Sequence, residues 1–151
     1  MANVVPYSFA QELLKGNHDF VNDTINIALY EAGSGAPYDV NSTVYSTGVS
    51  NQVGTSGTGY ATNGKPLQNA VVANQTNVAT LTFDTISWTS ATFGAAYGVI
   101  YNNSASDKLV VVLDFGGTKS CSNGTFTITF PSTSSSGPGA AGTNSLISIS
   151  S

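Results

Sequence analysis

Charged side chains are scarce in this sequence: Asp, Glu, Lys and Arg together make up 8% of its 151 residues, and arginine is absent. Four lysines and a net charge of −4 provide no basic surface that could neutralise phosphates. We therefore expect neither a nucleic acid nor a membrane as partner. Glycine, serine, threonine and asparagine fill the polar positions, so solubility depends on hydroxyl and amide groups.

Residues that usually hold metals are equally rare. Cys121 is the single cysteine and His18 the single histidine, so an intrachain disulfide, a thiolate zinc site and a histidine-rich site are all excluded. The acidic pair Asp19 and Asp23 lacks the alternating oxygen ligands of a calcium loop. We expect no metal, no cofactor and no catalytic residue. His18 is interpreted as a satisfied loop histidine, and Cys121 as a buried or turn cysteine.

Long apolar runs are missing too. No stretch approaches the roughly 18 apolar residues of a membrane span, and the N-terminus lacks the basic and apolar regions of a signal peptide. We expect synthesis in the cytoplasm. A hydrophobic content of 40% suffices for one core. The expected organisation is an N-terminal arm over residues 1–16, a β-sandwich domain over 17–131, and a flexible Gly/Ser/Pro segment with a terminal strand over 132–151.

One short helix is predicted near the N-terminus, over Ser8–Lys15. Ser8 is placed to cap it, Gln11 completes a Ser-x-x-Gln capping box, and Gly16 closes the segment. A helix of two turns is unstable alone, so its apolar stripe must pack on another surface. The stripe consists of Phe9, Leu13 and Leu14.

Later segments alternate with a period of two residues, which is typical of β-strands. Thr24–Glu31 reads as half-buried, whereas Lys108–Phe115 is apolar on both faces and reads as a central strand that ends at a Gly116-Gly117 turn. The pattern predicts an all-β fold, an antiparallel β-sandwich or jelly-roll-like barrel with one short N-terminal helix. The other predicted strands are Ala70–Ala73, Val78–Phe83, Ile86–Trp88, Gly94–Tyr101, Thr125–Phe130 and Leu146–Ser150.

Gly33–Gly64 reads as long loops around one or two short strands. Within it, the tyrosine-bearing stretch Ala36–Tyr60 is interpreted as an exposed contact surface, although a disordered loop is an equal alternative. The terminal strand follows a low-complexity segment, Ser132–Thr143, and is free to pair with its own chain or with a neighbour. The candidate interface residues are Phe9, Leu13, Leu14, Tyr38, Tyr45, Tyr60, Leu146, Ile147 and Ile149.

Blocks of residues along nearly the whole chain carry a family resemblance. They are Phe9–Leu14, His18–Phe20, Ile25–Tyr30, Gly57–Tyr60, Leu81–Asp84, Trp88, Ala91–Phe93, Ile100–Asn102, Val112–Gly117 and Gly124–Ile128. Through them the sequence resembles a family of small virion structural proteins of tailed bacteriophages. It departs from the family in the longer insertion Ser136–Ala141 and in the absence of a basic residue near Ala95 and Ala96.

The resemblance implies a non-enzymatic protein of the virion that has no catalytic residues to carry over. The first hypothesis is a capsid decoration or cement protein, which acts as a homo-oligomer through repeated contacts with phage structural proteins. The second is a neck, collar, tail or fibre component that binds host-surface glycans through exposed aromatic residues. An enzyme is the weakest hypothesis, because a depolymerase needs paired carboxylates and few acidic residues are present.

Overall fold

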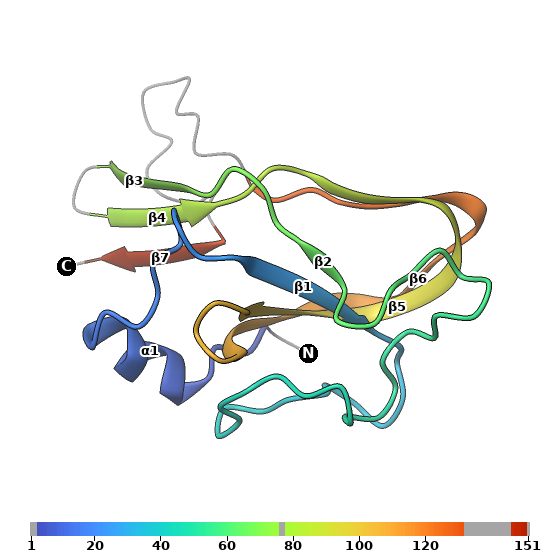
Figure 1. Ribbon diagram of the computed structural model, residues 1–151, viewed down its shortest axis with the longest axis horizontal. Coiled ribbons are helices and arrows are strands. Elements are labelled where there is room, and N and C mark those ends of the chain that lie inside the picture. Colours follow the sequence, from blue (N-terminus) through green and yellow to red (C-terminus); the bar gives the residue numbers. More distant parts are fainter. Residues whose placement is uncertain (1–2, 76–77, 132–145, 151) are drawn as a thin grey trace.

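The chain folds into two antiparallel sheets and one helix, in a computed structural model that describes residues 3–75, 78–131 and 146–150 (Figure 1). The four-stranded sheet has the order β2-β1-β5-β6, and the three-stranded sheet has the order β3-β4-β7. The predicted all-β class with one N-terminal helix is confirmed, while the sandwich or jelly-roll arrangement stays a prediction. The elements are α1 (Tyr7–Leu14), β1 (Ile25–Tyr30), β2 (Lys65–Pro66), β3 (Val71–Gln75), β4 (Val78–Thr82), β5 (Ile86–Asn102), β6 (Lys108–Ile128) and β7 (Ile147–Ser150).

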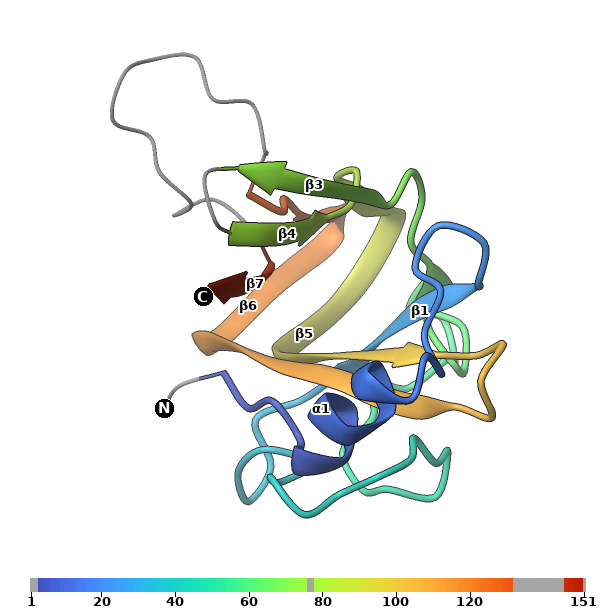
Figure 2. The ribbon, with the colours of Figure 1, turned by 90° about the vertical axis from the view of Figure 1, so that its left-hand side faces the viewer.

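Strands β5 and β6 form a long bent ribbon that Figure 2 shows passing beside the three-stranded sheet. The sequence pattern predicted two strands in place of each. The predicted turn at Gly116-Gly117 is wrong, because β6 continues through a bulge in which residues 115–118 lie opposite Ala96. Gly116 and Gly117 adopt φ angles of 70° and 120° there. Glycine tolerates these angles, so the strand bends without ending.

Two hydrophobic clusters lie against the four-stranded sheet. The larger cluster includes Phe9 of α1, Ile27 of β1, Leu81 of β4 and Trp88 of β5, so it joins the helix and both sheets. The smaller one is rich in tyrosine and lies under the long loop that precedes β2. The predicted cover on both faces is confirmed for residues 109–112 of β6, which are all buried, whereas residues 113–115 are half-buried. The predicted central position is wrong, because β6 is an edge strand of the four-stranded sheet.

The loop before β2 changes the expected burial of β1. We predicted a half-buried strand, but Ala28 and Tyr30, on the face expected to be open, are as inaccessible as the opposite face. Residues 33–64 contain no strand, and isolated bridges of Gln52 with Tyr30 and of Val44 with Lys108 fasten this loop to the sheet. The predicted long loop is confirmed, but the one or two short strands predicted within it are absent. The path of the loop over β1 explains why β1 is buried on both faces.

Helix α1 begins one residue earlier than predicted, and its predicted cap is absent. Pro6 is the N-cap and makes no side-chain hydrogen bond to the helix, while the Ser8 hydroxyl donates to the carbonyl oxygen of Ser42 at 3.3 Å. The predicted closure is confirmed, because Gly16 has a φ angle of 71° and its N–H donates to the carbonyl oxygen of Leu13. Among the described residues, no helix has the length and apolar character needed to cross a membrane.

The two ends of the described chain both lie against strands. Val4 exchanges two backbone hydrogen bonds of 2.8 Å with Val112, on the edge of β6. Strand β7 pairs with β4 of its own chain, which decides between the two pairings left open for the terminal strand in this structure. The predicted flexible segment Ser132–Thr143 and the insertion Ser136–Ala141 lie outside the described residues.

Candidate functional site

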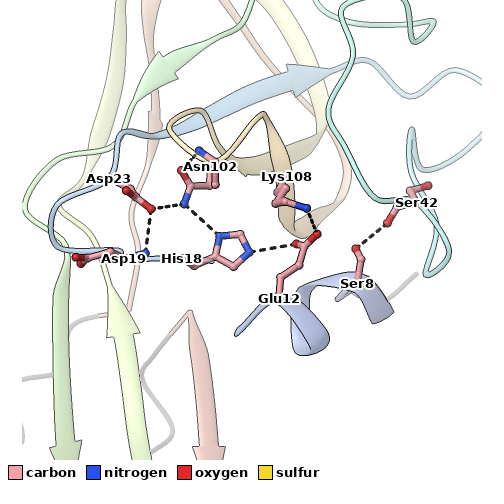
Figure 3. Close-up of polar contacts among 9 residues, drawn as sticks. Ser8, Glu12, His18, Asp19, Asp23, Ser42, Asn102 and Lys108 are labelled. Carbon is pink, nitrogen blue, oxygen red and sulfur yellow. Dashed lines mark hydrogen bonds and ion pairs between the residues drawn. The ribbon is translucent and has the colours of Figure 1, made fainter. Parts of the chain in front are cut away.

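Polar side chains gather where α1, the loop after it and the turn between β5 and β6 meet (Figure 3). Glu12 lies on α1, and His18 and Asp23 lie on the loop that leads into β1. Asn102 ends β5, and Lys108 begins β6. We call these five residues the His18 cluster. It joins three parts of the chain that are up to 96 residues apart.

Each member of the His18 cluster has a partner. His18 Nε2 lies 3.3 Å from Glu12 Oε2, and Lys108 Nζ lies 2.5 Å from Glu12 Oε1. On the other side of the ring, Asn102 Nδ2 lies 3.1 Å from His18 Nδ1 and 2.6 Å from Asp23 Oδ2. The interpretation of His18 as a satisfied loop histidine is confirmed, because both ring nitrogens have a partner.

The direction of these hydrogen bonds fixes the tautomer of His18. Asn102 Oδ1 accepts from the backbone N–H of Ala105, so the amide nitrogen of Asn102 must face Asp23 and His18. An amide NH₂ group only donates, and His18 Nδ1 must therefore accept. The proton of the neutral ring then lies on Nε2, where it donates to Glu12.

Burial lowers the pKa of His18 below its ordinary value, and burial is the largest influence. The Glu12 hydrogen bond and the charges of Glu12 and Asp23 act in the opposite direction, while Lys108 acts with burial. The ring lies against two aromatic rings, with centroids 5.3 Å from Phe9 and 5.6 Å from Phe20. The neutral imidazole is thus the form that fits this site.

The His18 cluster is closed to substrates. The His18 side chain has an exposed fraction of 0% and that of Glu12 has 8%. Both ring nitrogens are engaged, so neither is free to take a proton from a hydroxyl or thiol nucleophile. In the part of the chain that the structure describes, no three His, Cys, Asp or Glu side chains are grouped to hold a metal ion. The arrangement is suited to fastening α1 to the β5–β6 turn.

The three candidate interface tyrosines make polar contacts inside the fold: Tyr38 bonds to Tyr30 and Ser46, whereas Tyr45 and Tyr60 share Gln52. Tyr38, Tyr45 and Tyr60 are buried, which corrects the prediction that this loop exposes them. The ring of Tyr45 stacks on Tyr101 at 4.0 Å between centroids, and Gln52 Nε2 donates to both Tyr45 and Tyr60. Their hydroxyls provide hydrogen-bond partners for buried backbone N–H groups and side-chain amides that no neighbouring strand satisfies.

The Tyr60 hydroxyl shows how this network completes the sheet. Strand β1 pairs with β2 only through Asn26 and Ile27, so the N–H of Leu29 has no strand partner on that side. It donates to the Tyr60 hydroxyl at 2.9 Å. Burial raises the pKa of Tyr60, and it raises the pKa of Tyr101 to about 12. These hydroxyls stay neutral throughout the physiological range.

Apolar candidate residues line a groove between α1 and the three-stranded sheet. Its volume is about 90 Å³ and its lining surface is apolar. Phe9 is buried at its base, Leu13 and Ile147 are half-buried, and Leu14 at the end of α1 is 91% exposed. We call this the α1 groove. Its lining residues are Phe9, Leu13, Phe20, Val72, Ala79, Thr80, Leu81, Ile147 and Ile149.

Not every candidate residue lies in the α1 groove. Leu146 is half-buried, packs against the larger cluster and donates its N–H to the carbonyl oxygen of Leu81. Cys121, expected to be buried or in a turn, lies half-buried within β6, 3.7 Å from the carbonyl oxygen of Phe93. The exposed fraction reaches 56% at Val72 and 52% at Ile149. Sequence reasoning did not select Val72, although its place in an uncharged strand was a usable signal.

A second, more polar groove of about 580 Å³ runs beside the start of β1. Phe20 lies on one wall, and the exposed residues Thr24, Gln68 and Asn69 provide hydroxyl and amide groups. Asn69 Nδ2 is bound to Asp84 Oδ2 at 2.6 Å, so part of this polar lining is held in place. We call this the β1 groove.

Comparisons of the chain with protein-family models, with curated proteins and with solved structures gave no match.

Proposed function

We propose that the protein is a non-enzymatic structural component of a phage virion that decorates or cements the capsid through repeated protein contacts. The observation that carries this proposal is the contrast between its polar and apolar residues. Glu12 and His18 are the side chains best suited to acid–base chemistry, but they bind each other inside the fold and are not available to a substrate. Large apolar side chains such as Leu14 and Ile149 remain at the surface.

The edges of the two sheets support a contact surface on the three-stranded sheet. Edge strands attract other strands unless charge, proline or a bulge protects them. In the four-stranded sheet, β2 carries Lys65 and Pro66, and β6 carries Lys119 beside the Gly116-Gly117 bulge. The edge strands β3 and β7 have no charged residue and no proline. These uncharged edges lie next to the α1 groove.

An acidic chain associates with copies of itself most easily through such an uncharged surface, because like charges elsewhere repel. The proposed partners are therefore neighbouring copies of this chain and the shell proteins beneath them, with the protein residing in the virion. Many identical contacts, each weak, then give high avidity.

Copy number and assembly test the proposal. Hundreds of copies in each purified virion would support a place in the shell, whereas a dozen or fewer would support the neck or tail.

Deleting residues 1–16, or everything after Pro131, should weaken self-association in light scattering and co-sedimentation with particles that lack the protein. Both truncated chains need circular dichroism spectra to establish folding. A wild-type chain that is strictly monomeric and never sediments with particles contradicts the proposal.

The β1 groove supports the second candidate, a neck, collar, tail or fibre component that binds host glycans. An aromatic wall with amide and hydroxyl groups suits a sugar, which presents apolar faces and many hydroxyls. The experiment is a glycan array with the wild type, Asn69→Ala and Phe20→Ala. Binding that both substitutions abolish favours this candidate, and an array without signal removes it.

A further inference from the structure

The residues that hold α1 in place include one imidazole, a group whose ordinary pKa of about 6.5 lies near neutral pH. We propose that His18 is a proton-sensitive latch: its neutral ring holds α1 against the β5–β6 turn, and protonation of the ring releases the helix. The inference concerns the regulation of the α1 groove, and its biological meaning rests on the proposed function. The latch itself is a property of the isolated chain.

Helix α1 depends on contacts outside itself. It has eight residues, no side-chain cap, no acidic residue in its first turn and no basic residue in its last turn. Its N-terminal end is held by the Ser8 hydroxyl on Ser42 and by the Tyr7 N–H on the carbonyl oxygen of Val40. The inward side of the helix is held by Phe9 and by Glu12, and Glu12 is fastened to His18 and Lys108.

A second proton on His18 has no acceptor in this arrangement. It would lie on Nδ1, 3.1 Å from the amide nitrogen of Asn102, so two donors would face each other. Turning the Asn102 amide over would place its oxygen against Asp23 Oδ2 and its nitrogen against the N–H of Ala105. Either outcome breaks hydrogen bonds at the junction of the three segments.

The charges that face His18 come from every element around it. Glu12 on α1 and Asp23 before β1 attract an imidazolium, whereas Lys108 at the start of β6 repels it. Lys108 already binds Glu12, and Asn102 and the N–H of Asp19 already bind Asp23. Their attraction is thus partly compensated. Burial of a ring whose side chain is 0% exposed outweighs it.

Release of α1 would change the α1 groove. Phe9 and Leu13 form its helical wall, and Leu81 and Ile147 form its sheet wall. Undocking the helix separates the two walls, so the surface that α1 and the three-stranded sheet present together to another copy of the chain is lost. Acid would thereby weaken self-association, as deletion of residues 1–16 would, while neutral pH would keep that surface intact.

The single histidine makes the test direct. In the wild-type chain, the ¹⁵N shifts of the ring should show a neutral Nε2–H tautomer at neutral pH and a titration midpoint below the ordinary value of about 6.5. Hydrogen exchange then measures α1. Between about pH 7.5 and pH 5, the range in which histidines titrate, the protection factors of the α1 amides should fall several-fold while those of β5 stay constant.

A variant without a titrating ring is the matched control. Gln retains an amide donor and acceptor, so His18→Gln should keep α1 protected equally at both pH values. If His18→Gln does not fold, the wild-type tautomer and titration remain decisive. A midpoint at or above about 6.5, or equal loss of α1 protection in the wild type and His18→Gln, overturns the latch. Failure of the proposed function would appear separately, as a virion that lacks the protein.

Discussion

Two segments that are not strands cover the four-stranded sheet, and they are fastened by different chemistry. The loop over residues 31–64 is held by tyrosine hydroxyls, with Tyr60 bound to the N–H of Leu29 and Tyr45 stacked on Tyr101. Helix α1 is held by a histidine between a carboxylate and an amide. Hydroxyl groups with raised pKa values stay neutral well above physiological pH, whereas a histidine has an ordinary pKa of about 6.5 and gains a proton in acid. One attachment should therefore be constant and the other sensitive to acid.

The largest loss of stability is expected from a charge buried in the four-stranded sheet, on which both the loop and α1 pack. Val111 lies in β6 with an exposed fraction of 2%, and Val111→Asp places an unpaired carboxylate there. Such a burial costs several kcal/mol, against a total stability of about 5–15 kcal/mol for a domain. We expect this variant to unfold or aggregate. The exposed change Thr127→Asp on the same strand should be tolerated. Equal melting temperatures for the two variants would mean that the assignment of inside and outside is wrong.

The tyrosine attachment alone is broken by Tyr60→Phe. The ring remains, but the N–H of Leu29 and one donor of Gln52 lose their acceptor. A buried unsatisfied donor costs about 1–3 kcal/mol. We expect the free energy of unfolding, measured with urea, to fall by that amount. The fall should be equal at about pH 5 and pH 8, because the tyrosine hydroxyls and amides of this network do not titrate between these values. Tyr7→Phe, at a tyrosine that is 71% exposed, is the control and should change little.

The sequence predicted the sheet better than it predicted these attachments. Runs of apolar and β-branched residues located β1 and the start of β6 correctly, because strand propensity is a local signal, although the half-burial expected of β1 was wrong. The Gly116-Gly117 pair was misread, since positive φ values serve a bulge as well as a turn. His18 and Asn102 are 84 residues apart, and Tyr60 and Leu29 are 31 apart. No spacing rule brings such pairs together before the strand order is known.

The helix attachment is tested by the pH dependence of stability. The folded-state pKa of His18 lies below its unfolded value of about 6.5. Its contribution is therefore complete above that value, and it is lost as the pH falls from about 6.5 through the folded pKa. We expect the free energy of unfolding of the wild type to decrease from about pH 7.5 to pH 5.5. His18→Gln should show a shallower decrease. Parallel slopes for the two chains would remove His18 as the cause.

A substitution at Ile149 should have the smallest effect on stability of those considered, but a clear effect on self-association. Its side chain is 52% exposed on the edge strand β7, so Ile149→Lys should change the free energy of unfolding by no more than about 0.5 kcal/mol. The same lysine places a charge on an uncharged edge, and charge on an edge opposes pairing with another strand. Self-association measured by light scattering should therefore weaken.

Val44→Lys provides the matched control, because Val44 is similarly exposed, at 47%, on the loop that covers the opposite cluster. If both lysines weaken association equally, general charge governs it. If Ile149→Lys associates as strongly as the wild type, the edge of β7 is not the contact surface. The other large exposed side chain of this region, Leu14 at the end of α1, would then be the expected contact.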